Sequence, residues 1–311
     1  GHLMSPGPCR LDPDDAELLG GPVQPHYGPS WAAYLRQVWD DLAALLGAAR
    51  TYVLPGSGSA GLDAALFNLF EPGQRVVVVQ SGYFGDRLRA MAEAHDLEVR
   101  LAPCVPGEPV DPQVVAELLT GCDGLLVTHV ETATGVRHPV QQLAAAARAA
   151  GAVTLVDAIA AAGGEHIDMA RMGIDALVTA SQKGLGGAAG LAVVALGEGG
   201  LQRVRSRSRR PPSWYLDLVT WDELRGQPRP TVEDAAVTPE RQQGPAYVMF
   251  TSGSTGVPKG VAVDRDSLGL LCGWARTELG LAEGAVVSQA AGVGFDASAW
   301  EVWPALSAGC V

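Results

Sequence analysis

Hydrophobic and polar positions along residues 50–196 follow two alternating patterns. Short continuous apolar runs are typical of strands buried on both faces, and the stretches between them place apolar residues at helical spacing. The runs lie at 75–79, 124–128, 153–156, 176–179 and 191–196, and the helical stretches lie at 61–70, 85–95, 112–119 and 140–150. Strands that alternate with helices predict an α/β fold, a doubly wound and mostly parallel sheet sandwiched by helices.

A different texture follows this core. A polar, Pro-rich stretch at 225–244 predicts a linker or a long surface loop. Beyond it the pattern predicts a strand at 246–250, a helix at 267–279, a strand at 286–290 and a helix from about Ser298. We therefore divide the chain into a core at 5–222, a linker at 223–244 and a second unit at 245–311.

Composition narrows the class of protein. The 311 residues are 47% hydrophobic and 18% charged, which excludes wholesale disorder, and the net charge of −12 would repel nucleic acid phosphates and anionic lipids. No apolar run reaches the roughly 18 residues that span a bilayer. The five cysteines form no CxxC pair, so we expect no metal site. These features predict a cytoplasmic protein with neither nucleic acid nor membrane as partner.

Three short features of the core lie where predicted strands end. Ser57-Gly58-Ser59 precedes a helix, so its backbone N–H groups and hydroxyls form a candidate anion site. Asp157 ends the strand at 153–156, and Lys183 follows the strand at 176–179. Pyridoxal phosphate (PLP) needs an amine for a Schiff base, an acid for its pyridine nitrogen and a cradle for its phosphate. The three features together predict a PLP site.

Longer motifs surround these residues. They are SGYFGDR at 81–87, THVETATGV at 128–136 and SQK at 181–183, in addition to SPGP at 5–8. In this order they resemble the class V aminotransferases of PLP fold type I, especially the alanine–glyoxylate and serine–glyoxylate group. The resemblance runs to about Leu218. It implies that Lys183 forms the internal aldimine and moves the Cα proton, and that Asp157 pairs with the pyridine nitrogen.

The resemblance also assigns the other cofactor contacts. Ser57, Gly58 and Ser59 would hold the phosphate, and Gln182 would complete its shell. Phe84 would stack on one face of the ring and Ile159 would pack on the other, while Thr132 would contact the ring hydroxyl or its surroundings. Phe84 is alternatively a core residue. His26 matches a segment near the substrate, or else stabilises a turn.

The second unit carries a loop of hydroxyls, glycines and one lysine after a predicted strand. This loop resembles the phosphate loop of adenylate-forming enzymes, in particular the adenylation domains of nonribosomal peptide synthetases. The matching positions are Thr251, Ser252, Gly253, Ser254, Thr255, Gly256 and Lys259, and Asp296 matches the residue that receives the substrate's α-amino group. The domain is partial, so we expect weak or no nucleotide binding. ATP and Mg²⁺ would be cofactors only of a complete domain.

These resemblances lead to ranked hypotheses. The first is a PLP-dependent aminotransferase acting on an amino acid, free or carrier-bound, in nonribosomal peptide biosynthesis beside other synthetase modules. A β-eliminating lyase, a decarboxylase or a racemase on the same site stays open. The second is an adenylation domain with a PLP-like insertion, and the third is a non-catalytic module. Family sites are finished by a second subunit, so we expect a homodimer. The anchor for the substrate carboxylate stays unassigned.

Overall fold

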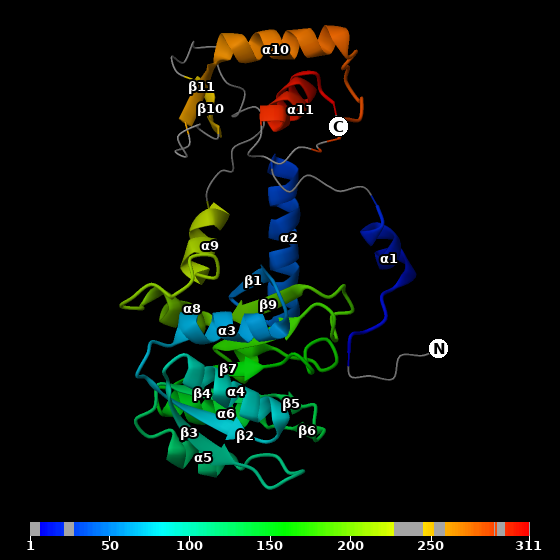
Figure 1. Cartoon of the computed structure of the whole chain (residues 1–311). Helices are drawn as coiled ribbons and strands as arrows, with labels where there is room; N and C mark the ends of the chain where they lie inside the picture. Colours follow the sequence, from blue (N-terminus) through cyan, green and yellow to red (C-terminus); the bar gives the residue numbers. More distant parts are fainter. Residues whose placement is uncertain are drawn as a thin grey trace. The chain divides into compact units, whose positions relative to one another are not determined.

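The computed structural model describes residues 7–21, 28–226, 245–251, 259–288, 290 and 296–310. The chain divides into two compact units, Gly1–Ala235 and Ala236–Val311, and the boundary between them in the sequence falls inside the segment predicted as a linker. Figure 1 shows the course of the chain through both units. Within the described ranges, no helix is long and apolar enough to cross a membrane.

One mixed sheet organises the first unit. In spatial order its strands are β1 (Arg50–Pro55), β9 (Leu191–Leu196), β8 (Ala176–Ala180), β7 (Val153–Asp157), β4 (Gly124–Thr128), β2 (Arg75–Gln80) and β3 (Glu98–Pro103). Neighbours from β3 to β8 pair in parallel, whereas β9 pairs antiparallel with both β8 and β1. The predicted mostly parallel sheet is therefore confirmed. A small hairpin of β5 (Val130–Glu131) and β6 (Val136–Arg137) follows β4.

Helices cover both faces of this sheet. The helices of the first unit are α1 (Pro13–Leu19), α2 (Gly28–Leu46), α3 (Gly58–Leu69), α4 (Tyr83–Ala94), α5 (Pro112–Leu118), α6 (Val140–Ala149), α7 (Met169–Met172), α8 (Glu198–Arg205) and α9 (Leu218–Gly226). Successive strand residues point to opposite faces. Val77 accordingly packs in one core cluster with Leu143 of α6, and Val78 packs in the other with Leu66 of α3. The result is a three-layer α/β/α sandwich.

The two edge strands of the sheet escaped prediction. β3 has polar or partly exposed residues at most positions, because an edge strand is covered less than a central one. β1 likewise begins with Arg50 and Thr51 and gives no continuous apolar run. Only the strands in the middle of the sheet and β9 carry the apolar runs on which the prediction relied.

Helix α9 extends the first unit beyond the predicted boundary at residue 222. The guanidinium of Arg225 lies 4.0 Å from the ring centroid of Trp39 and donates a hydrogen bond to the carbonyl of Thr51. Asp222 accepts a hydrogen bond from the hydroxyl of Tyr52. Residues 223–226, which the sequence placed in the linker, therefore belong to a helix that is anchored on α2 and β1.

The second unit consists, within its described ranges, of an antiparallel hairpin and two helices. These elements are β10 (Pro245–Thr251), β11 (Lys259–Asp264), α10 (Arg265–Glu278) and α11 (Asp296–Ser307). The strand predicted at 286–290 is wrong, because residues 286–288 and 290 adopt no strand and Val286 is 88% exposed. An apolar run becomes a strand only where a neighbouring strand pairs with it. β11 was not predicted.

Candidate active site

Lys183 lies on a compact turn just beyond the carboxyl end of β8. Its N–H donates to the carbonyl of Ala180 at 3.2 Å, and its own carbonyl accepts from Gly186 at 2.9 Å. The N–H of Gly187 donates to the carbonyl of Ser181 at 2.8 Å. These bonds fix the turn that carries the amine, as the sequence predicted for the end of this strand.

Asp157 is the last residue of β7, the neighbour of β8. The residue is 4% exposed, and its Oδ1 accepts a hydrogen bond from the N–H of Ile159 at 3.0 Å. Burial raises the pKa of this carboxyl to about 6, against the opposing effects of that hydrogen bond and of the positive charges of Arg87 and Lys183. Asp157 is therefore mostly ionised at neutral pH and lies within electrostatic reach of the amine.

A pair of glycines lets the loops after β7 and β8 touch through their backbones. A Cβ atom on Gly184 would lie 2.4 Å from the carbonyl oxygen of Ala162, and one on Gly163 would lie 2.3 Å from the carbonyl oxygen of Gly184. Gly163 also has a φ of +88°, which side chains other than glycine rarely adopt. Any larger residue at either position would separate the loops that carry Asp157 and Lys183.

The predicted phosphate cradle forms the start of α3. Ser57 is the N-cap, and its hydroxyl accepts from the N–H of Ala60 at 3.4 Å. The hydroxyl of Ser59 accepts a hydrogen bond from the guanidinium of Arg87. A Cβ atom on Gly58 would lie 2.4 Å from Cδ1 of Ile159, so the cradle packs directly against the residue two positions after Asp157.

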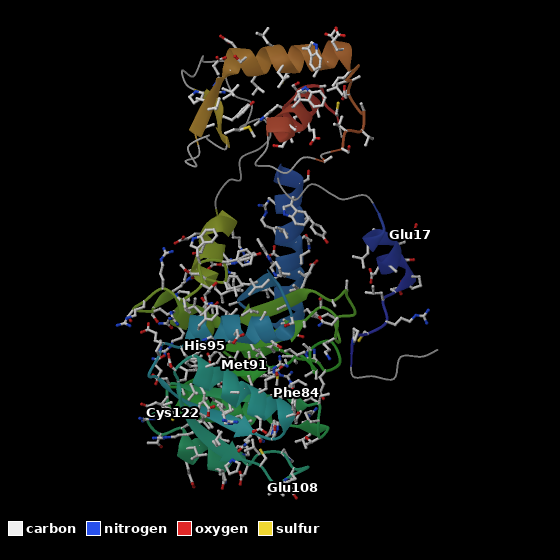
Figure 2. All side chains as sticks on the ribbon, viewed as in Figure 1. Glu17, Phe84, Met91, His95, Glu108 and Cys122 are labelled. Carbon is white, nitrogen blue, oxygen red and sulfur yellow. The ribbon has the colours of Figure 1, made fainter. Side chains whose placement is uncertain are left out.

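The remaining predicted contacts lie at the same edge of the sheet. Phe84, labelled in Figure 2, occupies the first turn of α4 and is half-buried. Its ring packs edge-on against that of Tyr83, with ring centroids 5.2 Å apart. Thr132 follows β5 and is half-buried. Gln182 is half-buried, and among the described residues its Oε1 has no hydrogen-bond partner although the atom is buried.

The N-terminal segment contributes contacts that sequence reasoning missed. The N–H of Cys9 donates to the carbonyl of Gln182 at 2.9 Å, and its thiol donates to the carbonyl of Lys183 at 3.0 Å. A Cβ atom on Gly7 would lie 2.6 Å from Nζ of Lys183, so this glycine leaves room for the amine. The SPGP motif at 5–8 could have indicated these contacts, because the resemblance to the family begins there. The resemblance assigned no role to its residues.

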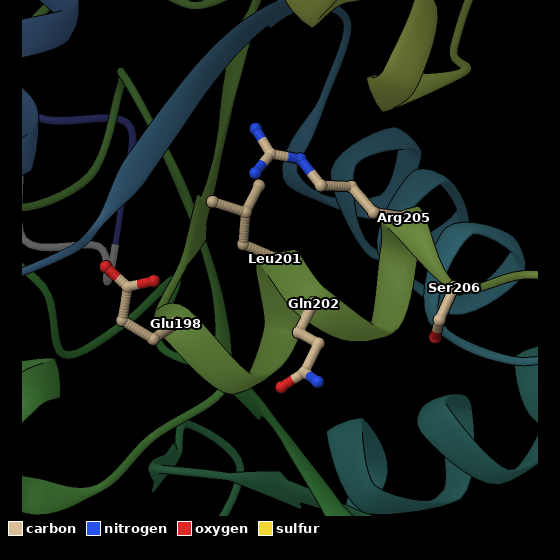
Figure 3. Close-up of a pocket in the computed structure, with 5 residues that line it drawn as sticks. All are labelled: Glu198, Leu201, Gln202, Arg205 and Ser206. Atoms are coloured by element: carbon tan, nitrogen blue, oxygen red, sulfur yellow. The ribbon is translucent and has the colours of Figure 1, made fainter.

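Several predicted residues cannot be placed. His26 and the loop positions 252–256 lie outside the described residues, as do the side chains of Thr251, Lys259 and Asp296. A surface hollow of about 450 Å³ lies elsewhere, along α8 (Figure 3). It is lined by Glu198, Leu201, Gln202, Arg205 and Ser206. Because one helix supplies nearly all of its lining and none of the predicted site residues reaches it, the hollow is not the active site.

The residues at the carboxyl edge of the sheet fit PLP. They offer a primary amine, an ionised acid removed from water, and N–H donors and hydroxyls at a helix N-terminus, which are the groups that its aldehyde, pyridine nitrogen and phosphate require. Two further hydroxyls at this edge, those of Ser81 and Thr128, are buried without a hydrogen-bond partner in the described part of the chain. Unpartnered buried polar atoms are costly unless a ligand or water satisfies them.

The chain is similar to several known aminotransferases. The chain is 34% identical over 178 residues to alanine–glyoxylate aminotransferase of Rattus norvegicus, covering 57% of this chain and 43% of that protein. It is 28% identical over 223 residues to an uncharacterized aminotransferase of Methanocaldococcus jannaschii, covering 70% and 58%. The crystal structure of ureidoglycine–glyoxylate aminotransferase from Bacillus subtilis superimposes with a TM-score of 0.69 at 27% identity, covering 72% and 59%.

The chain spans about half the length of the curated relatives it matches. Its first unit has the α/β architecture of PLP fold type I. The family model for aminotransferase class V matches residues 23–208, which is more than half of the chain. The chain therefore belongs to the class V aminotransferase family.

Proposed function

We propose that this protein is a PLP-dependent aminotransferase that moves the amino group of a small amino acid to an oxo acid such as glyoxylate. One observation carries the proposal: Lys183 and the buried Asp157 lie at the carboxyl ends of adjacent strands, β8 and β7. The choice of reaction is supported by two relatives that are named alanine–glyoxylate aminotransferase and (S)-ureidoglycine–glyoxylate transaminase. Both names combine an amino-group donor with glyoxylate.

Each residue would have a distinct task in this reaction. When bound, PLP withdraws electrons from the bonds at the Cα atom of an amino acid. Asp157 would accept a hydrogen bond from the pyridine nitrogen and keep its proton in place. Lys183 would hold the cofactor and then carry the proton at Cα, since its turn brings the amine to the site. The start of α3 would bind the phosphate.

The other predicted contacts would orient the ring. Phe84 and Ile159 would cover its two faces, Thr132 would contact the ring hydroxyl, and Gln182 would bind the phosphate through its amide. The cleft would be completed by a second copy of the chain, since closed dimers are the commonest assembly and the family site is shared. His26 would contact the substrate.

A single-turnover assay tests the proposal. The chain loaded with PLP is mixed with a panel of amino acids, and conversion to pyridoxamine phosphate is measured by chromatography. We expect conversion with at least one small amino acid and reversal by glyoxylate. The chain contains two lysines, so Lys183→Ala should abolish conversion and Lys259→Ala serves as a matched control that should retain it.

The alternatives for the same site give other products. A lyase would release an oxo acid and ammonia while PLP is recovered unchanged, and a racemase would incorporate deuterium at Cα without forming an oxo acid. A decarboxylase would release carbon dioxide and an amine. Bound PLP that stays unchanged with every amino acid, with none of these products, would exclude catalysis on this panel and would favour a non-catalytic module.

We further propose, from the sequence resemblance, that residues 245–311 are part of an adenylation domain and that the protein works in nonribosomal peptide biosynthesis with a free or carrier-bound amino acid. The order of elements supports this, because β10 ends at Thr251 where the loop begins and β11 starts at Lys259. We expect residues 245–311 to support no amino-acid-dependent pyrophosphate exchange. Robust exchange would instead support an adenylation enzyme with a PLP-like insertion.

A further inference from the structure

Glu131 is a buried carboxylate at the edge of the candidate site to which no role has been given so far. The residue has no exposed surface, and it ends β5 between the sheet and the hairpin turn. Its Oε2 accepts hydrogen bonds from the N–H groups of Phe84 and Gly85, both at 3.1 Å. Its Oε1 accepts from the N–H of Ala133 at 3.0 Å. Both oxygens of the carboxylate are thus committed to backbone donors.

These bonds replace the cap that α4 lacks. The N-cap residue of α4 is Gly82, which has no side chain to accept from the first turn, and its φ is +155°. The first N–H groups of a helix have no partner within the helix, so they need an acceptor from elsewhere. A Cβ atom on Gly82 would lie 2.9 Å from the carboxyl carbon of Glu131, so only glycine leaves room for this distant cap.

The same carboxylate fixes the hairpin turn on its other side. Ala133 is held through Oε1, and the carbonyl of Glu131 accepts from Thr134 at 3.2 Å and from Gly135 at 2.7 Å. Thr132 lies between Glu131 and Ala133, whose backbone atoms take part in these hydrogen bonds. One side chain therefore ties together the backbone at Phe84 and the backbone around Thr132, although these positions are far apart in the sequence.

We propose that Glu131 is a positioning residue for the PLP ring: it sets, through backbone hydrogen bonds, where Phe84 and Thr132 stand relative to the ring. The inference rests on the proposed function. It explains why an ionisable group is buried here rather than an apolar one. The negative charge of Glu131 also helps to raise the pKa of Asp157, after the larger effect of burial.

A double-mutant cycle on cofactor affinity tests this role. The dissociation constants of PLP and of pyridoxal, which lacks the phosphate, are measured for wild type, Glu131→Gln, Phe84→Ala and the double variant. Glutamine cannot accept from the donors at both ends of the side chain, because one end of its amide is itself a donor. We expect Glu131→Gln to weaken both ligands about tenfold in the wild type and less than threefold in the Phe84→Ala background, since interacting residues are non-additive.

Asp175→Asn is the matched control. Asp175 is a half-buried carboxylate that also accepts a backbone hydrogen bond, from the N–H of Thr154 at 2.9 Å. It precedes β8 and therefore lies at the opposite edge of the sheet from Lys183. We expect Asp175→Asn to leave both dissociation constants unchanged, even where the melting temperature shifts. A merely structural role for Glu131 would give the same pattern for Glu131→Gln.

The outcomes separate this proposal from the proposed function. Additive losses in the cycle, or unchanged affinity in Glu131→Gln, overturn the role of Glu131 while the wild type still binds PLP. A wild type that binds neither ligand overturns the proposed function and this inference with it. If Glu131→Gln does not fold, amide exchange is measured in the wild-type apoprotein. The N–H groups of Phe84 and Gly85 should be strongly protected, and rapid exchange would contradict the positioning role of Glu131.

Discussion

Asp123 and Asp157, at opposite edges of the central sheet, differ in how far the chain satisfies their carboxylates. At the amino edge, Asp123 precedes β4 and accepts from the N–H of Arg75 at 2.9 Å and from the side chain of Gln74 at 3.1 Å, with Arg203 at 3.8 Å. At the carboxyl edge, the more deeply buried Asp157 accepts one described hydrogen bond, from Ile159. The chain satisfies the first carboxylate by itself and leaves the second with capacity for a ligand. An incompletely satisfied buried acid is typical of a functional site.

The largest expected effect is on cofactor binding when the carboxylate at the functional edge is neutralised. Asp157→Asn should weaken PLP binding at least 100-fold, because the amide cannot form a charged pair with the pyridine nitrogen. The same change should stabilise the apoprotein at pH 7 by up to about 3 kcal/mol, since the carboxyl has a pKa raised from 3.8 to about 6 and its ionised form is disfavoured by burial. Equilibrium dialysis and urea unfolding measure the two effects. A destabilised apoprotein with unchanged affinity would reverse the comparison.

The pH dependence of stability sharpens the contrast. Burial lowers the pKa of His138 to about 4, so the neutral ring favours folding above pH 6.5 and this contribution is lost as the pH falls toward 4. Asp157 acts in the opposite direction, since its raised pKa makes the folded state more stable as the pH falls from about 6 to 4. In the wild-type apoprotein the two effects partly cancel.

Asp157→Asn should remove that cancellation. We expect the variant to lose up to about 3 kcal/mol of stability between pH 6.5 and pH 4, whereas the wild type changes much less. Unfolding curves in urea at pH 4, 5, 6 and 7 provide the measurement. Parallel pH profiles for the two proteins would show that Asp157 has no raised pKa.

A smaller effect of opposite kind is expected at the structural edge. Asp123→Asn keeps one acceptor oxygen of the side chain and loses the other. Because the side chain is partly exposed, the substitution should lower the free energy of unfolding by only about 1 kcal/mol. The dissociation constant of PLP should not change. A loss of cofactor affinity as large as that of Asp157→Asn would remove the distinction between the edges.

Removal of residues 236–311 should have the smallest effect. Both edges belong to the first unit, whose described residues build two hydrophobic clusters of their own. The shortened chain should bind PLP with the affinity of the full chain, as measured by fluorescence quenching. A tenfold weaker affinity would mean that the second unit takes part in the site.

The sequence predicted the central strands, and the positions of Lys183 and Asp157 at strand ends, because both depend on the local pattern of apolar residues. Asp157 follows one apolar run directly and Lys183 follows another after a gap of three residues, so their place at strand ends could be inferred. Glu131 could not be recognised in the same way, since its partners Phe84 and Gly85 are 47 and 46 residues away and are engaged through backbone atoms. The prediction of a strand at 286–290 failed for a related reason. Residues 286–288 and 290 pair with no strand in the described part of the chain, and an apolar run forms a strand only when a neighbouring strand pairs with it.

The central claim is that the carboxyl edge of the sheet is a PLP site built on Lys183, and borohydride reduction tests it most directly. The loaded protein is reduced, digested and analysed by mass spectrometry. Because Lys183 and Lys259 are the two lysines of the chain, the modified peptide identifies the site without ambiguity. We predict that the cofactor is fixed to the peptide that contains Lys183, and that Lys183→Ala carries none. Cofactor fixed to Lys259, or to no lysine at all, would contradict the account.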